Sequence, residues 1–410
     1  MNRKSLKNIT YLFLFFSFAF PKAGIMLAGF PINVSLVLFL FCIIINIDNI
    51  ISFFYNHKKI LSLYLIYAFM IILVCLINLK NKNLLQIFKS LIILLSPLCI
   101  CFIEKLDIKK VHKILLFSLF IVSFFTIMQF IFGIEKFSIE GITHAYGEDL
   151  STKNIGFGSS NYADAYKMPS TYQNGNSAAL FIILSITSLY YFSSLFDYKQ
   201  RRMTLIICLF GGISLFLSGS RTGAYSLIIS LFIVFTLYFI KNIKIIRVKY
   251  SSVILFNISI LFLLISLLCF SDSNFINQIY DRFILQTLND STGGNRLTQI
   301  SNINTIVSNN ATFDMIFRLF FFGLDWRLSL EAEGIYLLVI YYGLITTILL
   351  YSFIILLIYK CKEKNYLLMI GPLTILICFI VDSSYFYIPA LFNLFLIGAI
   401  NIKERGGQNE

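Results

Sequence analysis

Residues 217–225 read Leu217-Ser218-Gly219-Ser220-Arg221-Thr222-Gly223-Ala224-Tyr225 and separate two apolar runs, residues 203–217 and 225–240. Runs of this kind are typical of helices that span a bilayer, so the segment between them is expected at a membrane surface. Arg221 is the only charged residue in the segment. A lone cation among small residues at the end of a span therefore marks a candidate functional position.

The chemistry of Arg221 and its neighbours favours an anion. A guanidinium presents a planar set of donors that matches phosphate oxygens. We expect a helix to begin near Thr222, and its free amides would also favour a negative charge. Ser220 and Thr222 would add hydroxyl donors. The competing interpretation is an arginine that only reaches toward the membrane interface or caps a helix.

The whole chain has the composition of a membrane protein. Of its 410 residues, 58% are hydrophobic and 13% are charged. We therefore predict an all-α fold, a polytopic bundle of about 12 transmembrane helices of about 20 residues each. The predicted spans are residues 8–27, 31–53, 60–78, 84–103, 112–133, 174–196, 203–219, 222–240, 251–270, 334–359, 366–383 and 386–402.

The basic residues gather in alternate loops between these spans. The net charge of +13 would suggest a nucleic-acid partner in a soluble protein, but this loop pattern explains it, and we expect no nucleic acid. The positive-inside rule makes the basic loops and both termini cytoplasmic. The basic loops include Lys58, Lys59, Lys105, Lys109, Lys110, Lys113, Lys199, Arg201, Arg202, Lys241, Lys360, Lys362, Lys364 and Lys403.

Two long polar segments fall on the opposite, outer side and divide the chain. Segments of this length tend to be functional or disordered. The expected organisation is spans 1–5 in residues 1–132, a first outer loop in 133–173, spans 6–9 in 174–270, a second outer loop in 271–333, and spans 10–12 with a tail in 334–410. The 8 cysteines lie in or beside spans, so we expect packing residues; no metal and no cofactor is predicted.

The second outer loop supplies further cations. Arg296 follows a flexible stretch rich in glycine, and it could share the charge of a diphosphate with Arg221. Arg318 and Arg327, with Arg282, are weaker candidates, because a single loop arginine is usually a solvated surface residue.

The same loop ends with two carboxylates, Glu331 and Glu333. Residues two apart point to different sides of a helix, so only one of them would face a site. Glu333 is next to the following apolar run and is the preferred general base, with Glu331 second. An acid that only favours a helix start is the alternative.

The first outer loop ends in a polar turn before the next span. Asn174 and Asn176 are expected to position sugar hydroxyls, and Tyr166 and Tyr172 would suit stacking on sugar faces. Capping of the following helix is the competing role for the amides. His144, the only histidine of this side, is expected to be incidental, and Asp382 is expected to lie at the interface.

Several of these stretches together resemble the superfamily of O-antigen polymerases (Wzy-type) and O-antigen ligases, which are bacterial membrane glycosyltransferases. The most specific stretch is Ser218-Gly219-Ser220-Arg221-Thr222-Gly223. Less specific ones are Pro169-Ser170-Thr171-Tyr172-Gln173-Asn174-Gly175-Asn176, Gly294-Asn295-Arg296, Phe322-Gly323-Leu324, Glu333-Gly334-Ile335-Tyr336-Leu337 and Tyr342-Gly343-Leu344. As architecture, the resemblance covers nearly the whole chain.

The resemblance implies a GT-C-like bundle in the bacterial cell inner membrane that uses an undecaprenyl-diphosphate-linked oligosaccharide. Arg221 and Arg296, at the matching positions, would hold the diphosphate. Membrane lipid, a chain-length regulator and a flippase are the partners that it implies.

The resemblance also implies glycosyl transfer and leaves a choice of acceptor. Ligases of the superfamily carry a histidine near the start of the span after the second large loop, whereas Glu331-Ala332-Glu333 stands at that place here. The expected function is therefore polymerisation of repeat units, with a ligase as the alternative. A lipid-linked saccharide flippase is the alternative from another class, although cations in loops rather than in spans argue against it.

Overall fold

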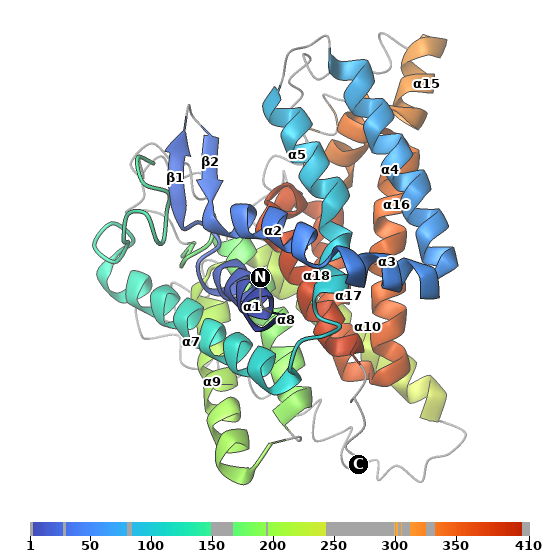
Figure 1. Cartoon of the computed structure of the whole chain (residues 1–410). Coiled ribbons are helices and arrows are strands. Elements are labelled where there is room, and N and C mark those ends of the chain that lie inside the picture. The colour runs from blue at the N-terminus through green and yellow to red at the C-terminus, as the bar shows by residue number, and fades with distance from the viewer. Residues whose placement is uncertain are drawn as a thin grey trace.

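The computed structural model describes residues 3–27, 30–79, 84–148, 167–193, 196–242, 312–324 and 333–403, together with residues 299, 301 and 305. Over these ranges the chain is a bundle of helices with one short β-hairpin at its side (Figure 1). The hairpin pairs β1 (Gly24–Leu27) with β2 (Phe30–Asn33) in antiparallel register.

The N-terminal part of the chain contributes the helices that precede the first long connection. They are α1 (Arg3–Ala19), α2 (Val34–Ile45), α3 (Ile47–Asn56), α4 (Lys58–Asn78), α5 (Leu84–Leu95), η2 (Ser96–Leu98), α6 (Cys99–Phe102) and α7 (Ile108–Phe132). The rest of the described chain forms α8 (Gly175–Ser193), α9 (Tyr198–Leu217), α10 (Arg221–Asn242), α15 (Phe313–Phe321), α16 (Gly334–Lys364), α17 (Tyr366–Val381), η6 (Ser383–Phe386) and α18 (Ile388–Ile402).

Seven helical segments of the described chain are long and apolar enough to cross a membrane, or 8 if the bent pair α2–α3 is one span. Two further apolar helices, α17 and α18, are shorter. The predicted character of a helical, multi-pass membrane protein is therefore confirmed. The predicted number of 12 spans is not reached in these ranges, and the predicted span 251–270 lies outside the described residues.

Two predicted spans differ from the observed elements, while the described chain as a whole agrees with an all-α bundle apart from the one short hairpin. The span predicted at 8–27 ends as a helix at Ala19, because Pro21 cannot continue a helical hydrogen-bond ladder, and the chain then enters β1. The span predicted at 31–53 begins as β2 and bends by 65° between α2 and α3. At this bend, the Asn46 amide donates to the Cys42 carbonyl over 2.9 Å and Asn49 donates to the Asn46 side chain over 2.9 Å.

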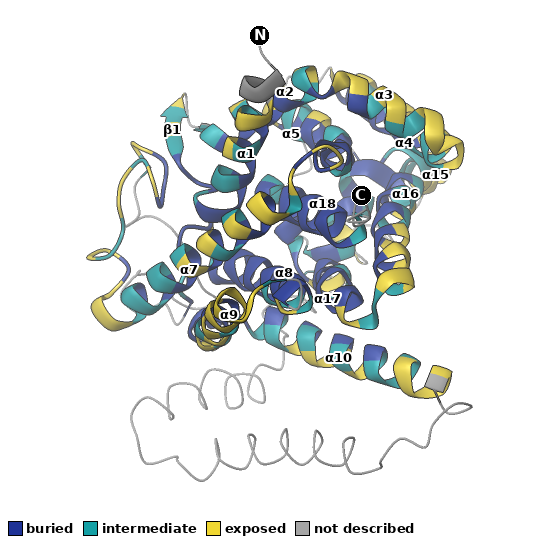
Figure 2. Ribbon diagram, turned by 60° about the horizontal axis from the view of Figure 1, so that its bottom comes forward, coloured by how far each residue is buried: buried dark blue, intermediate teal, exposed yellow. Residues whose placement is uncertain are grey.

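The most deeply buried helices, α8 and α18, lie at the centre of the bundle, next to α17 (Figure 2). Tyr172, which precedes α8, forms hydrogen bonds with both α1 and α18. Tyr172 is 1% exposed, donates from its hydroxyl to the Phe18 carbonyl over 2.8 Å, and accepts from the Asn393 amide of α18 over 2.9 Å.

The seven described cysteines are free and buried, which agrees with a packing role.

The bundle has two chemically different ends, because sequential helices reverse direction. At one end, Lys241 of α10 and Lys362 of α16 both lie over the ring of Tyr366, the first residue of α17. The same end holds the start of α4 and of α9, with their lysines and arginines. We call it the basic end. The turn between α9 and α10, the start of α8 and the start of α16 lie at the opposite end.

Candidate functional site

The turn that carries Arg221 connects α9 to α10 at the end opposite to the basic end. Helix α9 ends at Leu217 and α10 begins at Arg221, so the helix start predicted near Thr222 is confirmed within one residue. The Ser220 hydroxyl accepts from the Gly223 amide over 3.0 Å, which caps the first turn of α10. Ser220 is 1% exposed, so its hydroxyl is enclosed by protein.

The start of α8 packs directly against this turn. The Ser218 carbonyl accepts from the Met168 amide over 3.2 Å. A Cβ atom at Gly175, the first residue of α8, would lie 2.3 Å from the same carbonyl oxygen, so only glycine permits this approach. The two segments that the sequence singled out, 167–178 and 217–225, are therefore in contact.

A chain of hydrogen bonds leads from the turn to Asp382. The Ser220 hydroxyl donates to Oδ1 of Asn176 over 2.8 Å, and Nδ2 of Asn176 donates to Oδ2 of Asp382 over 2.6 Å. Each polar atom of the Asn176 side chain thus has a protein partner. The arrangement makes Ser220 and Asn176 positioning residues that hold a carboxylate.

Asp382 lies between α17 and η6 and is 8% exposed. Its Oδ1 accepts from the Ser384 amide over 2.9 Å and also from the Ser384 hydroxyl. With the bond from Asn176, three donors surround this carboxylate. Several donors hold a buried carboxylate in one orientation and offset the cost of its burial.

Glu333 is brought to the same place by a close approach of backbones. The Gly334 amide donates to the Ser383 hydroxyl over 3.2 Å, and the Tyr385 hydroxyl donates to the Gly334 carbonyl over 2.5 Å. Gly334 has φ +59°, and a Cβ there would lie 2.1 Å from the Ile380 carbonyl oxygen. Glycine is therefore required at the start of α16, directly after Glu333.

A cavity of about 510 Å³ opens between these elements. Glu333, Asp382 and Asn174 line it together with Lys22 and Lys89. Asn174 also caps α8, since its Oδ1 accepts from the Ser177 amide over 2.9 Å. The remaining wall is made by Pro31, Asn33, Ser35, Leu36, Leu85, Glu148, Gln173, Ser177, Ser383, Ser384, Phe386, Tyr387, Ile388, Pro389 and Phe392. Cations, carboxylates and hydroxyls thus converge on a space large enough for part of a saccharide.

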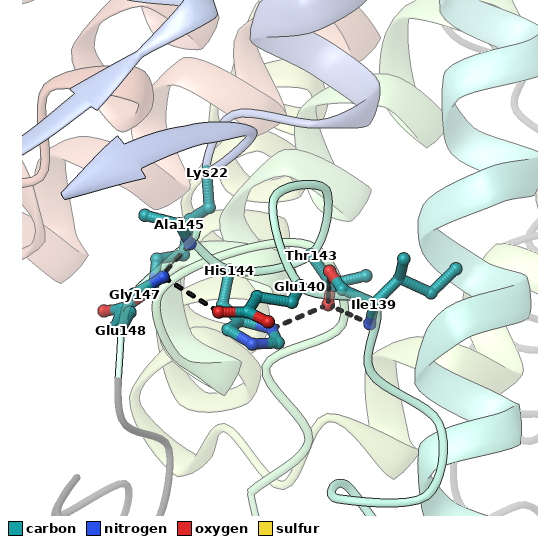
Figure 3. Close-up of polar contacts among 8 residues, drawn as sticks. All are labelled: Lys22, Ile139, Glu140, Thr143, His144, Ala145, Gly147 and Glu148. Carbon is teal, nitrogen blue, oxygen red and sulfur yellow. Dashed lines mark hydrogen bonds and ion pairs between the residues drawn. The ribbon is translucent and has the colours of Figure 1, made fainter.

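Of the two lysines, Lys22 forms a buried ion pair. Its Nζ lies 2.7 Å from Oε2 of Glu148, with side chains 7% and 10% exposed. The Ala145 amide also donates to Glu148, over 3.1 Å (Figure 3). Tyr146, from the same outer segment, exchanges backbone hydrogen bonds with Gly24 and Met26 of β1. Glu148, in the described segment 133–148, and the hairpin therefore lie in one wall of the cavity.

Lys89 reaches the cavity from the first half of α5. Side chains of α5 next to Lys89 are hydrogen-bonded to α16. On neighbouring positions of α5, Gln86 donates to the Tyr342 hydroxyl over 3.3 Å, and Ser90 is 3.1 Å from the same oxygen. A cation inside a spanning helix is costly unless it is paired or faces a polar space. The cavity provides this polar space for Lys89.

Other predicted residues lie elsewhere. Arg221 and Thr222 are half-buried at the start of α10 and are not among the cavity residues. Arg318 lies on α15, with its Nε 3.5 Å from Oδ2 of Asp314 in an exposed pair. Glu331, Arg296, Arg327, Arg282 and Tyr166 lie outside the described residues.

Two further expectations, for Tyr172 and Asp382, need correction, and a third, for His144, is unchanged. The stacking role for Tyr172 is wrong, because its ring is buried in the core and its hydroxyl is used between α1 and α18. Asp382 was expected at the membrane interface, but its side chain is buried, at 8% exposure. His144 lies in the outer loop, with Nδ1 3.2 Å from the Thr143 hydroxyl, and is not among the cavity residues (Figure 3).

Sequence reasoning missed Lys22 and Lys89, and it missed the donors that hold Asp382. A signal existed for Lys89, since it interrupts an otherwise apolar run, and intramembrane charges are functional candidates. Asp382 carried the same signal. Lys22 had no comparable signal, because a loop lysine next to a proline is ordinary until its partner Glu148 is known.

Comparisons with known proteins add no family. A scan against models of known families found no family that matches this chain, and a search of curated proteins found no match.

Proposed function

We propose that this protein is a polysaccharide polymerase of the O-antigen polymerase type in the bacterial inner membrane. It would join undecaprenyl-diphosphate-linked oligosaccharide repeat units on the periplasmic side and release undecaprenyl diphosphate. The observation that carries the proposal is the cavity that collects Glu333, Asp382 and Lys89 at the end of the bundle away from the basic end.

The location of the cavity fits a lipid-linked donor. By the positive-inside rule the basic end faces the cytoplasm, so the cavity would face the periplasm. The residues around it come from the start of α5, of α16 and of α18, where apolar helices meet polar segments. A substrate with a long lipid and a polar head needs such a boundary.

The reaction needs little more than positioning and charge stabilisation, because the donor already carries a good leaving group. In the proposed step, an acceptor hydroxyl of one repeat unit attacks the anomeric carbon of the growing chain. Its proton passes to the Glu333 carboxylate. The bond between the anomeric carbon and the diphosphate oxygen breaks, and undecaprenyl diphosphate leaves with the electron pair.

The residues divide into three roles in this proposal. Lys89 binds the diphosphate in the cavity, since Lys22 is already matched by Glu148. Arg221 adds a second cation from the start of α10, beside the helix amides. Asp382, held by Asn176 and Ser384, orients the acceptor hydroxyls.

A lipid-linked saccharide transporter is a second candidate, and Lys89 is the observation that favours it. The cation lies in the helical segment Leu84–Phe102, which is long and apolar enough to span the membrane. Cations inside a bundle are what a pathway for an anionic lipid head would require.

The deciding experiment is deletion of the gene, followed by electrophoresis of the surface polysaccharide. A polymerase predicts lipid A-core that carries a single repeat unit. A ligase predicts bare core with polymer retained on undecaprenyl diphosphate, and a transporter predicts bare core without polymer. An unchanged ladder would refute the whole proposal.

A further inference from the structure

A second cavity, of about 710 Å³, lies between α7 and α9 at the basic end, far along both helices from the turn at Arg221. Its walls are mainly apolar. Phe117 and Phe120 of α7 and Met203 and Ile206 of α9 line it, and all four side chains are exposed on the outside of the bundle. Because both helices can span a membrane, this groove faces hydrocarbon.

The groove is cationic at one end only. Lys113 comes from the first turns of α7, and Lys199 and Arg202 come from the first turn or two of α9. The apolar wall residues follow each of these cations along its helix, toward the middle of the membrane. The groove thus changes from charged to apolar along the direction in which a phospholipid changes from headgroup to acyl chain.

His112 is a buried polar residue among the side chains that line the groove. It lines the cavity and is 5% exposed, with its ring 4.2 Å from the ring of Phe196. Its Nε2 is buried and has no hydrogen-bond partner among the residues that the structure describes. A buried polar atom without a partner is costly, so a ligand that supplies a hydrogen-bonding oxygen would recover that cost.

We propose that this groove binds an anionic glycerophospholipid of the leaflet at the basic end. The phosphate lies between Lys113, Lys199 and Arg202, a phosphate or ester oxygen meets Nε2 of His112, and an acyl chain covers Phe117, Phe120, Met203 and Ile206. Three cations favour a lipid with net negative charge over a zwitterionic one. The site is independent of the polymerase proposal, since it lies at the other end of the bundle.

The test is lipid titration of the purified full-length protein, followed by native mass spectrometry. Dioleoylphosphatidylglycerol is compared with dioleoylphosphatidylcholine and with soluble glycerol phosphate. In the groove variant Lys113→Gln/Lys199→Gln/Arg202→Gln, we expect the affinity for the anionic lipid to fall by at least about tenfold. The matched control, Lys105→Gln/Lys109→Gln/Arg201→Gln, removes the same charge from the same end outside the groove and should retain the wild-type affinity.

A second variant tests the apolar part. Met203→Trp narrows the groove from an exposed position and leaves every charge in place, so we expect weaker binding of the anionic lipid with unchanged thermal unfolding. The proposal is overturned by equal binding of the two lipids, by an equal loss in the control variant, or by undiminished binding to Met203→Trp. It is also overturned if glycerol phosphate binds as tightly as the lipid. The same holds if native mass spectrometry shows a second protein bound one to one in the groove in place of the lipid.

Discussion

The amide of Asn176 donates to the carboxylate of Asp382 over 2.6 Å, across 206 residues of sequence. This bond joins the start of α8 to the end of α17, and Ser220 extends it to the start of α10. Three helix ends therefore share one buried hydrogen-bond chain. Loss of any member leaves a buried polar group without its partner, which is the costly case for a hydrogen bond.

Asn176→Ala tests how much this chain of hydrogen bonds contributes to the stability of the protein. The variant removes a donor from Asp382 and an acceptor from Ser220, so we expect a loss of about 1–3 kcal/mol in the free energy of unfolding. Thermal unfolding of the detergent-solubilised protein measures it. Asp197→Asn, at an exposed position whose side chain makes no capping hydrogen bond, should leave the unfolding temperature unchanged. Equal stability of Asn176→Ala and wild type would contradict the role of the chain.

Gly334→Ala tests the approach of α16 to α17. The new Cβ would lie 2.1 Å from the Ile380 carbonyl oxygen, at a φ of +59°, so the two backbones must separate. We expect destabilisation of at least about 1–3 kcal/mol and loss of polymer, because Glu333 moves. Gly212→Ala in α9 is the matched control. A Cβ there meets nothing within 4 Å, so that change should be neutral or stabilising by about 0.5–1 kcal/mol.

Glu333→Gln tests the proposed base. The amide keeps the size of the side chain but cannot accept the proton, so we expect polymerisation to fall by about 10²–10⁴-fold with the fold intact. The polysaccharide ladder and the protein abundance are measured together. Glu135→Gln changes an exposed carboxylate of the same outer region and should leave the ladder unchanged. A full ladder with Glu333→Gln would remove Glu333 from the reaction.

The pair Lys22–Glu148 separates a structural role from a binding role. Removing either partner alone, as in Lys22→Met or Glu148→Leu, leaves a buried charge, and we expect a loss of about 3–5 kcal/mol. The double variant Lys22→Met/Glu148→Leu should regain most of this stability. If the double variant also restores polymer length, Lys22 acts only through the ion pair. A stable double variant without polymer would instead assign Lys22 to the substrate.

Arg221→Lys tests the remaining predicted cation. Lysine keeps the charge and loses the planar pair of donors, so we expect a shorter polymer at normal protein abundance if Arg221 binds the diphosphate. Arg201→Lys, at the basic end, serves as the control and should have no effect. Full polymer length with Arg221→Lys would exclude a bidentate contact of Arg221 with phosphate.

The sequence by itself determined the membrane class, most helix positions and the turn at Arg221. Long apolar runs have no alternative to helices in hydrocarbon, and the small residues from Ser218 to Gly223 permit a tight connection. It also identified Glu333 and Asn174, which the structure brings to one cavity. Local composition is sufficient for these features because the bilayer and the backbone impose them residue by residue.

Only the tertiary structure decided which polar residues share a site. Lys22, Lys89 and Asp382 come from three distant parts of the chain, and no local pattern joins Lys22 to Glu148 or Asn176 to Asp382. The broken span at Asn46 and the buried position of Tyr172 depend in the same way on remote partners. Buried polar groups are stabilised by whichever donors packing brings within reach, and packing is a property of the whole bundle.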